Sequence, residues 1–170
     1  MKAARFVAGL ILLPLCIVVT RVLFSLLLEL RSGSSGGVPV AAWALAAGFI
    51  FWNFLYFTLS RPVRSYVLAH ELTHALWGSL MGARVSRLRV GAESGSVTLS
   101  KSNFLITLAP YFFPLYTVIL IAAYYVLAVF FDVRPYEPVW LGLVGLTWGF
   151  HLTFTIRTLI QRQTDIQEYG

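Results

Sequence analysis

The chain has 170 residues, of which 58% are hydrophobic and 12% charged, and its mean hydropathy is +0.78. Soluble domains carry about twice that charged fraction, so the composition excludes an ordinary soluble domain and predicts an integral, multi-pass membrane protein. The net charge of +6 predicts no nucleic-acid partner, because Lys and Arg commonly anchor span ends and no basic and aromatic patch accompanies them. The single cysteine, Cys16, excludes a disulfide framework.

Two apolar runs occupy the N-terminal third of the chain. The first, residues 6–30, is long enough to cross a membrane and contains Arg21, which we expect to snorkel or to find a partner inside the bundle. Residues 31–37 are rich in Gly and Ser and predict a flexible linker. Residues 38–59 form the second apolar run. We therefore expect residues 1–64 to contribute two N-terminal spans and a linker.

The next predicted helix covers residues 65–81, ends at Gly82, and carries His70, Glu71 and His74. Positions i and i+4 lie on one helix face, so both imidazoles can reach one metal ion. Glu71 lies about 100° around the helix, where a general base belongs. The alternative is that these three side chains lie on a helix surface by chance and bind no metal. It is disfavoured because charged groups in an apolar helix cost at least about 2.5 kcal/mol each unless paired or bound to metal. The motif predicts one zinc ion per chain.

The only stretch with strand periodicity follows this helix. In residues 85–90, Arg87 and Arg89 share one face while Leu88 and Val90 share the other, and residues 96–100 alternate similarly after a glycine-containing connection. We predict a β-hairpin; a surface loop is the alternative.

Two further apolar runs complete the chain. Residues 104–131 are long enough to cross with a tilt, and contain Pro110 and Pro114, which predict either irregular backbone near a site or a simple kink. After a short turn, residues 139–160 form the last apolar run. The distribution of Lys and Arg weakly favours an orientation in which the hairpin and the C-terminus are cytoplasmic.

A catalytic zinc generally takes three protein ligands and a water molecule, so one more ligand is needed. The other carboxylates lie at predicted loops, span ends or the tail. Two candidates therefore stay open: His151, inside the last apolar run, and Asp165, in the polar tail of residues 161–170. His151 has the better depth relative to His74. A lone histidine beside aromatic residues is, however, often an interior hydrogen-bonded group.

These residues resemble a known family. An apolar helix with the His70-Glu71-x-x-His74 motif, then a hairpin, then two spans with an acidic residue near their end, is similar to the site-2 protease type of intramembrane zinc metalloprotease, the M50 peptidases, in a compact branch. The resemblance covers residues 65–170 in order of elements, and only the five-residue motif is highly specific. It implies His70 and His74 as zinc ligands, Glu71 as general base, Asp165 as third ligand, and a hairpin edge that receives an unwound substrate.

The sequence departs from the family pattern in three places. Thr73 stands where many members have Gly, which leaves ligand geometry unaffected. The Asn-Pro and Leu-Asp-Gly signature that usually frames the acidic ligand is absent, so Asp165 is assigned by position and chemistry. Members of this branch also continue past the position of Gly170 into another apolar segment.

The sequence therefore predicts a single membrane domain over residues 1–170, with a metalloprotease-like core at residues 65–170. Its fold class is all-α, with about five transmembrane or intramembrane helices and a small hairpin. The predicted activity is zinc-dependent intramembrane endopeptidase, acting on membrane-protein or peptide substrates within the lipid bilayer of a bacterial-type inner membrane. The alternative is a non-proteolytic pseudoenzyme, or a membrane protein that binds zinc or partners. The two readings differ at Glu71, because only an enzyme needs a base there.

Overall fold

The structure is a computed structural model that describes residues 17, 18, 21 and 40–160. Two compact units divide the chain, residues 1–40 and residues 41–170. Most of the predicted first span, the predicted linker and the polar tail with Asp165 lie outside the described residues. The elements from Val40 to Ile160 lie in the second unit, apart from Val40 itself at the start of the first of these helices.

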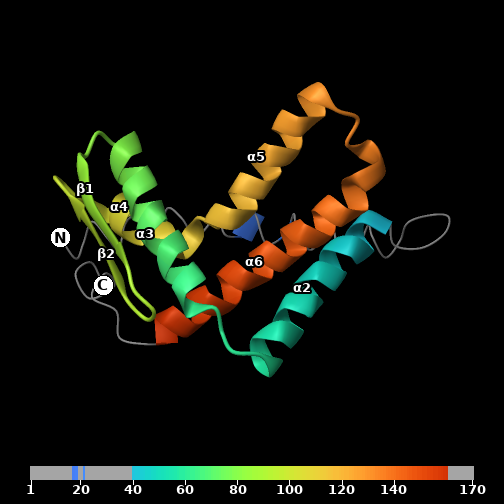
Figure 1. The fold of residues 1–170 in the computed structure, drawn as a ribbon, viewed down its shortest axis with the longest axis horizontal. Coiled ribbons are helices and arrows are strands. Elements are labelled where there is room, and N and C mark those ends of the chain that lie inside the picture. The colour runs from blue at the N-terminus through green and yellow to red at the C-terminus, as the bar shows by residue number, and fades with distance from the viewer. Residues whose placement is uncertain (1–16, 19–20, 22–39, 161–170) are drawn as a thin grey trace. The chain divides into compact units, whose positions relative to one another are not determined.

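Helices dominate the described residues, as predicted (Figure 1). In chain order the elements are α2 (Val40–Thr58), α3 (Val63–Leu80), β1 (Val85–Val90), β2 (Gly95–Leu99), α4 (Phe104–Phe112), α5 (Leu115–Phe130), the short 3-10 helix η1 (Arg134–Tyr136) and α6 (Glu137–Ile160). Helix α6 begins two residues before the predicted last run, and η1 occupies part of the predicted turn.

Helix α3 carries the histidine motif and is followed directly by the predicted hairpin. The helix ends at Leu80, and the chain reverses through Gly82, whose φ of 74° lies in the left-handed region that favours glycine. Strands β1 and β2 then pair antiparallel, with Val90 opposite Gly95 and an irregularity in register near the start of β1. Both strands contact α3. The predicted hairpin is confirmed, and its second strand begins one residue early.

The apolar run at residues 104–131 is two helices rather than one tilted span. Helices α4 and α5 meet at an angle of 75°, and the break falls at Phe113 and Pro114. Pro114 cannot donate a backbone hydrogen bond, and the residue before a proline avoids helical backbone angles. Phe113 is accordingly extended, with φ −104° and ψ 102°. Pro114 thus produces a sharp break with irregular backbone, whereas Pro110 lies inside α4.

Helices α2 and α6 pack against each other through glycine. A Cβ atom at Gly145 would collide with the carbonyl oxygen of Leu45, and one at Gly48 would collide with the carbonyl oxygen of Gly142. Small residues let helix backbones approach this closely, and Gly145 and Gly149 form a GxxxG pair on α6. Four aromatic side chains continue the contact as a buried cluster. They are Trp52, Tyr56, Phe150 and Phe154.

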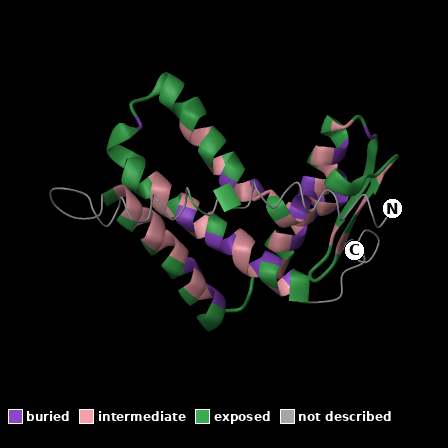
Figure 2. Ribbon diagram, turned by 180° about the vertical axis from the view of Figure 1, so that it is seen from behind, coloured by how far each residue is buried: buried purple, intermediate pink, exposed green. Residues whose placement is uncertain are grey.

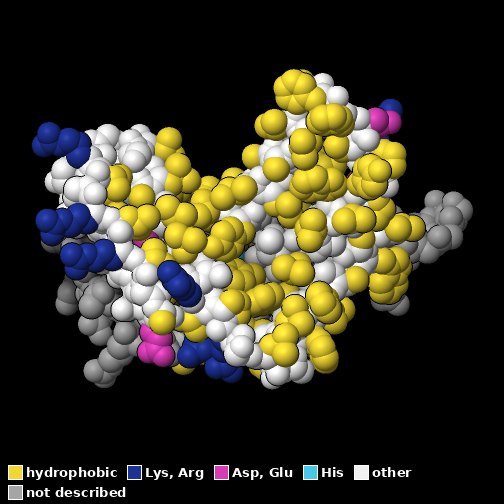
Figure 3. All heavy atoms as spheres, viewed as in Figure 1, with side chains coloured by type: hydrophobic (Ala, Val, Ile, Leu, Met, Phe, Trp, Pro, Cys, Tyr) yellow, Lys and Arg dark blue, Asp and Glu magenta, His cyan; other side chains and the backbone are white. Residues whose placement is uncertain are grey.

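Buried residues are concentrated where α3 meets α4, where α6 meets α2, and at the start of α5, while the outer faces of α2 and α5 are largely exposed (Figure 2). The exposed faces are rich in large apolar side chains, whereas basic side chains gather on the side of the hairpin (Figure 3). By length and composition, α2 and residues 134–160 are apolar enough to cross a membrane, and α4 with α5 would make a third span if counted together. Among the described residues, α3 does not meet this criterion.

Candidate metal centre

The two histidines of the motif converge on one point. His70 and His74 lie one helical turn apart on α3, and their Nε2 atoms are 3.2 Å from each other. Two nitrogens that bind one tetrahedral zinc ion at about 2.0 to 2.1 Å lie roughly 3.3 Å apart. The observed separation therefore fits two ligands of a single ion. This is the arrangement that the i, i+4 spacing predicted.

His74 is held by a main-chain carbonyl on α4. Its Nδ1 lies 2.9 Å from the carbonyl oxygen of Ile106, a residue with only 1% of its surface exposed. A carbonyl can only accept a hydrogen bond, so Nδ1 must carry the proton. Nε2 of the neutral ring then presents its lone pair, which is the form that binds metal. The fold therefore selects the ligand tautomer of His74.

His70 contacts a hydroxyl group on its own helix rather than a main-chain carbonyl. Its Nδ1 lies 3.4 Å from the Tyr66 hydroxyl, which in turn accepts a 2.9 Å hydrogen bond from Thr158 on α6. A hydroxyl can donate or accept, so Tyr66 is compatible with either tautomer of His70. The Tyr66 ring also stacks on Phe154, with centroids 4.8 Å apart. These contacts connect α6 to the motif helix at the position of the first histidine.

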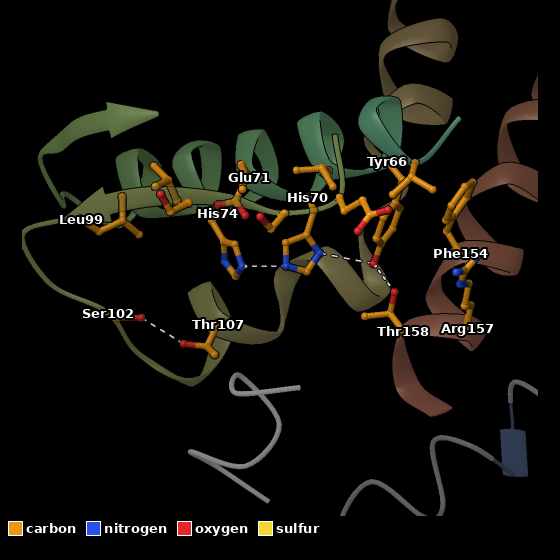
Figure 4. Close-up of a pocket in the computed structure, with 17 residues that line it drawn as sticks. Tyr66, His70, Glu71, His74, Leu99, Ser102, Thr107, Phe154, Arg157 and Thr158 are labelled. Carbon is orange, nitrogen blue, oxygen red and sulfur yellow. Dashed lines mark hydrogen bonds between the residues drawn. The ribbon is translucent and has the colours of Figure 1, made fainter. Parts of the chain in front are cut away.

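Both imidazoles and Glu71 line one cavity of about 830 Å³, between α3, β2, α4 and α6. In Figure 4 His70 and His74 point into this space, with Tyr66 and Thr158 toward one end and Leu99 and Ser102 toward the other. Glu71 is only 8% exposed. A Cβ atom on Gly95 would lie 2.7 Å from Cγ of Glu71, so the start of β2 passes directly against this side chain.

Strand β2 forms one wall of the cavity along its length. All of its residues except Thr98 line the cavity, and at its far end Leu99 packs against Gly78 of α3. Among the residues that the structure describes, the sheet has two strands, and β2 pairs with β1 along one of its edges. An extended peptide can add to such an edge through main-chain hydrogen bonds. The hairpin thus places a strand edge beside the two histidines and Glu71.

The described residues supply two of the three expected ligands. Within residues 17, 18, 21 and 40–160, no group of three His, Cys, Asp or Glu side chains could hold a metal ion. His151, the alternative third ligand, does not join the pair. It lines a separate small cavity behind His70 and hydrogen-bonds the backbone of Tyr111 at the end of α4. This contact corresponds to the interior hydrogen-bonded role. Asp165 lies outside the described residues.

Sequence reasoning missed three residues that hold the histidines. Tyr66 precedes His70 by four positions and therefore shares its helix face, a signal that the spacing rule could have used. Pro110 has no N–H, so the sequence shows that the Ile106 carbonyl lacks its usual helical donor. It does not show which side chain donates to that carbonyl instead. Nothing in the sequence identifies Thr158, because its contact joins positions 92 apart in the chain.

Comparison with known proteins adds no further assignment. No protein-family model, no curated protein and no solved structure matches this chain.

Proposed function

We propose that the chain is a zinc-dependent intramembrane endopeptidase. The observation that carries the proposal is the convergence of the His70 and His74 Nε2 atoms at 3.2 Å, in a cavity that Glu71 also lines. A histidine pair with ligand spacing, a neighbouring buried carboxylate and room for a peptide are the parts that metal-assisted hydrolysis needs.

His70 and His74 would hold the ion, and Asp165 is the proposed third ligand because it follows the last helix and bears a carboxylate. When bound, zinc supplies a Lewis acid that makes water acidic enough to attack a peptide carbonyl near neutral pH. Glu71 accepts the proton from the attacking water and passes it to the leaving amine. Because Glu71 is largely buried, its carboxylate meets little competing solvent during this transfer.

The edge of β2 that faces away from β1 is the proposed place for the substrate. Carbonyl groups in an intact helix are tied in hydrogen bonds to the residue four positions ahead, so a membrane-spanning substrate must unwind before cleavage. Pairing with the edge of Gly95–Leu99 would replace the lost main-chain bonds. The apolar outer surfaces of α2, α5 and α6 support a location in a membrane, and we propose the bacterial-type inner membrane.

The test is zinc content and peptide cleavage by the full chain purified in detergent. Wild type is expected to hold one zinc ion and to cleave members of a pool of apolar helical peptides in the same micelles, followed by mass spectrometry. Glu71→Gln should keep the zinc and lose about 10²- to 10⁴-fold in rate. His74→Ala should lose both. Asp165→Ala should lose zinc while His151→Ala keeps it.

Glu137→Gln is the matched control, because Glu137 is an exposed carboxylate in the first turn of α6, outside the cavity. It should retain zinc and wild-type cleavage. Zinc binding with equal cleavage by wild type and Glu71→Gln would exclude Glu71 as the base. A wild-type protein that binds no zinc after reconstitution would reject the metal site itself.

A further inference from the structure

We infer that Pro110 is a positioning residue for the metal site, because it frees the Ile106 carbonyl to hold His74 in its ligand tautomer. The inference rests on the proposed zinc site for its functional consequence, and on the hydrogen bonds of α4 for its physical basis. In this role Pro110 touches neither the proposed ion nor the substrate. It acts through one main-chain oxygen.

The position of Pro110 determines which carbonyl is affected. In an α-helix the N–H of each residue donates to the carbonyl four residues earlier, so residue 110 would normally donate to Ile106. Proline has no N–H, and its ring pushes against that same carbonyl. Pro110 lies inside α4 and is buried. The Ile106 oxygen is thus without its helical donor inside the protein, and needs another.

His74 supplies the replacement donor. Its Nδ1 reaches the Ile106 oxygen at 2.9 Å, a normal distance for an N–H to oxygen bond. The rest of the first turn of α4 is fixed by its cap, since the Asn103 side chain accepts from the Ile106 N–H at 3.0 Å. The peptide groups around Ile106 are therefore held on both sides. The oxygen that faces His74 has little freedom to turn away.

The two histidines differ in the group that contacts Nδ1. A carbonyl accepts only, so it fixes the proton of His74 on Nδ1, whereas the Tyr66 hydroxyl beside His70 allows either tautomer. Groups that orient metal-binding histidines typically change metal affinity by 10- to 100-fold when they are removed. An alanine at position 110 would restore an N–H that competes with His74 for the Ile106 oxygen, and would also remove the ring that displaces it.

The experiment compares wild type, Pro110→Ala and Pro138→Ala as full chains in detergent. Zinc affinity is measured by competition with a chromophoric chelator, and thermal midpoints are measured on the zinc-free proteins. Pro110→Ala is expected to bind zinc 10- to 100-fold more weakly, with a zinc-free midpoint no lower than wild type. Pro138 lies in the first turn of α6, where a helix has no N–H bond to lose, so Pro138→Ala should match wild type.

Nitrogen NMR of ¹⁵N-histidine gives a readout that does not depend on zinc. The chain has three histidines, so His70→Ala and His151→Ala suffice to assign the signals. At a pH where the rings are neutral, His74 should carry its proton on Nδ1 in wild type, and the Nε2–H form should increase in Pro110→Ala.

The outcomes separate the two proposals. Wild type that binds zinc, with a Pro110→Ala affinity within about twofold of it and an unchanged His74 tautomer, overturns the role of Pro110 and leaves the zinc site standing. Wild type that binds no zinc rejects the proposed function, while the tautomer comparison still tests Pro110. If Pro110→Ala does not fold, wild-type NMR decides: a proton on Nε2 of His74 overturns the inference.

Discussion

Gly145 and Gly95 each lie at a close approach between two elements, and their roles differ. Gly145 brings α6 against the backbone of α2, where an added Cβ would meet the carbonyl oxygen of Leu45. Gly95 brings β2 against side chains of α3, where an added Cβ would lie 2.6 Å from Val67 Cγ1 and 2.7 Å from Glu71 Cγ. Neither neighbour has room for a methyl group.

The role of each glycine depends on whether its neighbour is a backbone atom or a side chain. A backbone carbonyl in a packed helix cannot move without moving the helix, so Gly145 controls the association of α2 with α6. A glutamate side chain can rotate, so Gly95 controls where Glu71 points. The region around Gly145 is apolar and aromatic, whereas the region around Gly95 contains the two motif histidines and the cavity. Substitutions should therefore separate stability from activity.

The largest effect is expected for Gly145→Ala. The new Cβ overlaps the Leu45 carbonyl, and such overpacking typically costs about 1 to 3 kcal/mol or more. Thermal unfolding in detergent measures it. Gly142→Ala is the matched control, because its Cβ would lie 3.5 Å from the Ala44 oxygen, an ordinary contact. Alanine is favoured over glycine in helices by about 1 kcal/mol, so this control should be neutral or stabilised. Equal destabilisation by both would contradict the close packing of α2 on α6.

A smaller and different effect is expected for Gly95→Ala. The methyl group should displace the Glu71 side chain, so peptide cleavage should fall about 10-fold or more while zinc content stays at the wild-type level. Thr98→Ala is the control on the same strand, because Thr98 is exposed and does not line the cavity. A loss of zinc along with cleavage would show that Gly95 supports the whole site rather than Glu71 alone.

The smallest effect is expected away from both glycines, at Asp132. Hydrogen bonds from Arg134 lower the pKa of this exposed carboxyl group below its usual value near 3.8. A lowered pKa gives stability that is present above the unfolded-state pKa and lost as the pH falls through the folded-state pKa. Asp132→Asn should therefore melt marginally below wild type at neutral pH, and the difference should shrink as the pH falls below about 4 and vanish below the lowered pKa of Asp132. A larger difference in acid than at neutral pH would contradict this sign.

The features that sequence predicted well are local ones. The convergence of His70 and His74 follows from helix geometry alone, and the hairpin follows from alternation over a few residues. Both are set by neighbours within one element. The helical boundaries of α3 also follow from Pro62 and Gly82, which flank it in the chain.

The features that sequence missed depend on contacts between distant elements. The spacing of Pro110 and Pro114 predicted irregular backbone, but not the 75° bend between α4 and α5, because the direction of a break depends on what each helix packs against. The role of His151 as a partner of the Tyr111 backbone depends on the end of α4 lying beside α6. Small residues at Gly145 and Gly149 were visible, but which helix they face is not local information.

The proline inside α4 has a consequence for engineering this protein. Rules for stabilising helices would select Pro110 for replacement, since alanine is preferred over proline in a helix interior by about 3 kcal/mol. A screen that rewards heat resistance would then enrich Pro110→Ala and, with it, proteins that hold zinc less tightly. Selection for thermostability and selection for metal loading would act in opposite directions at this one residue.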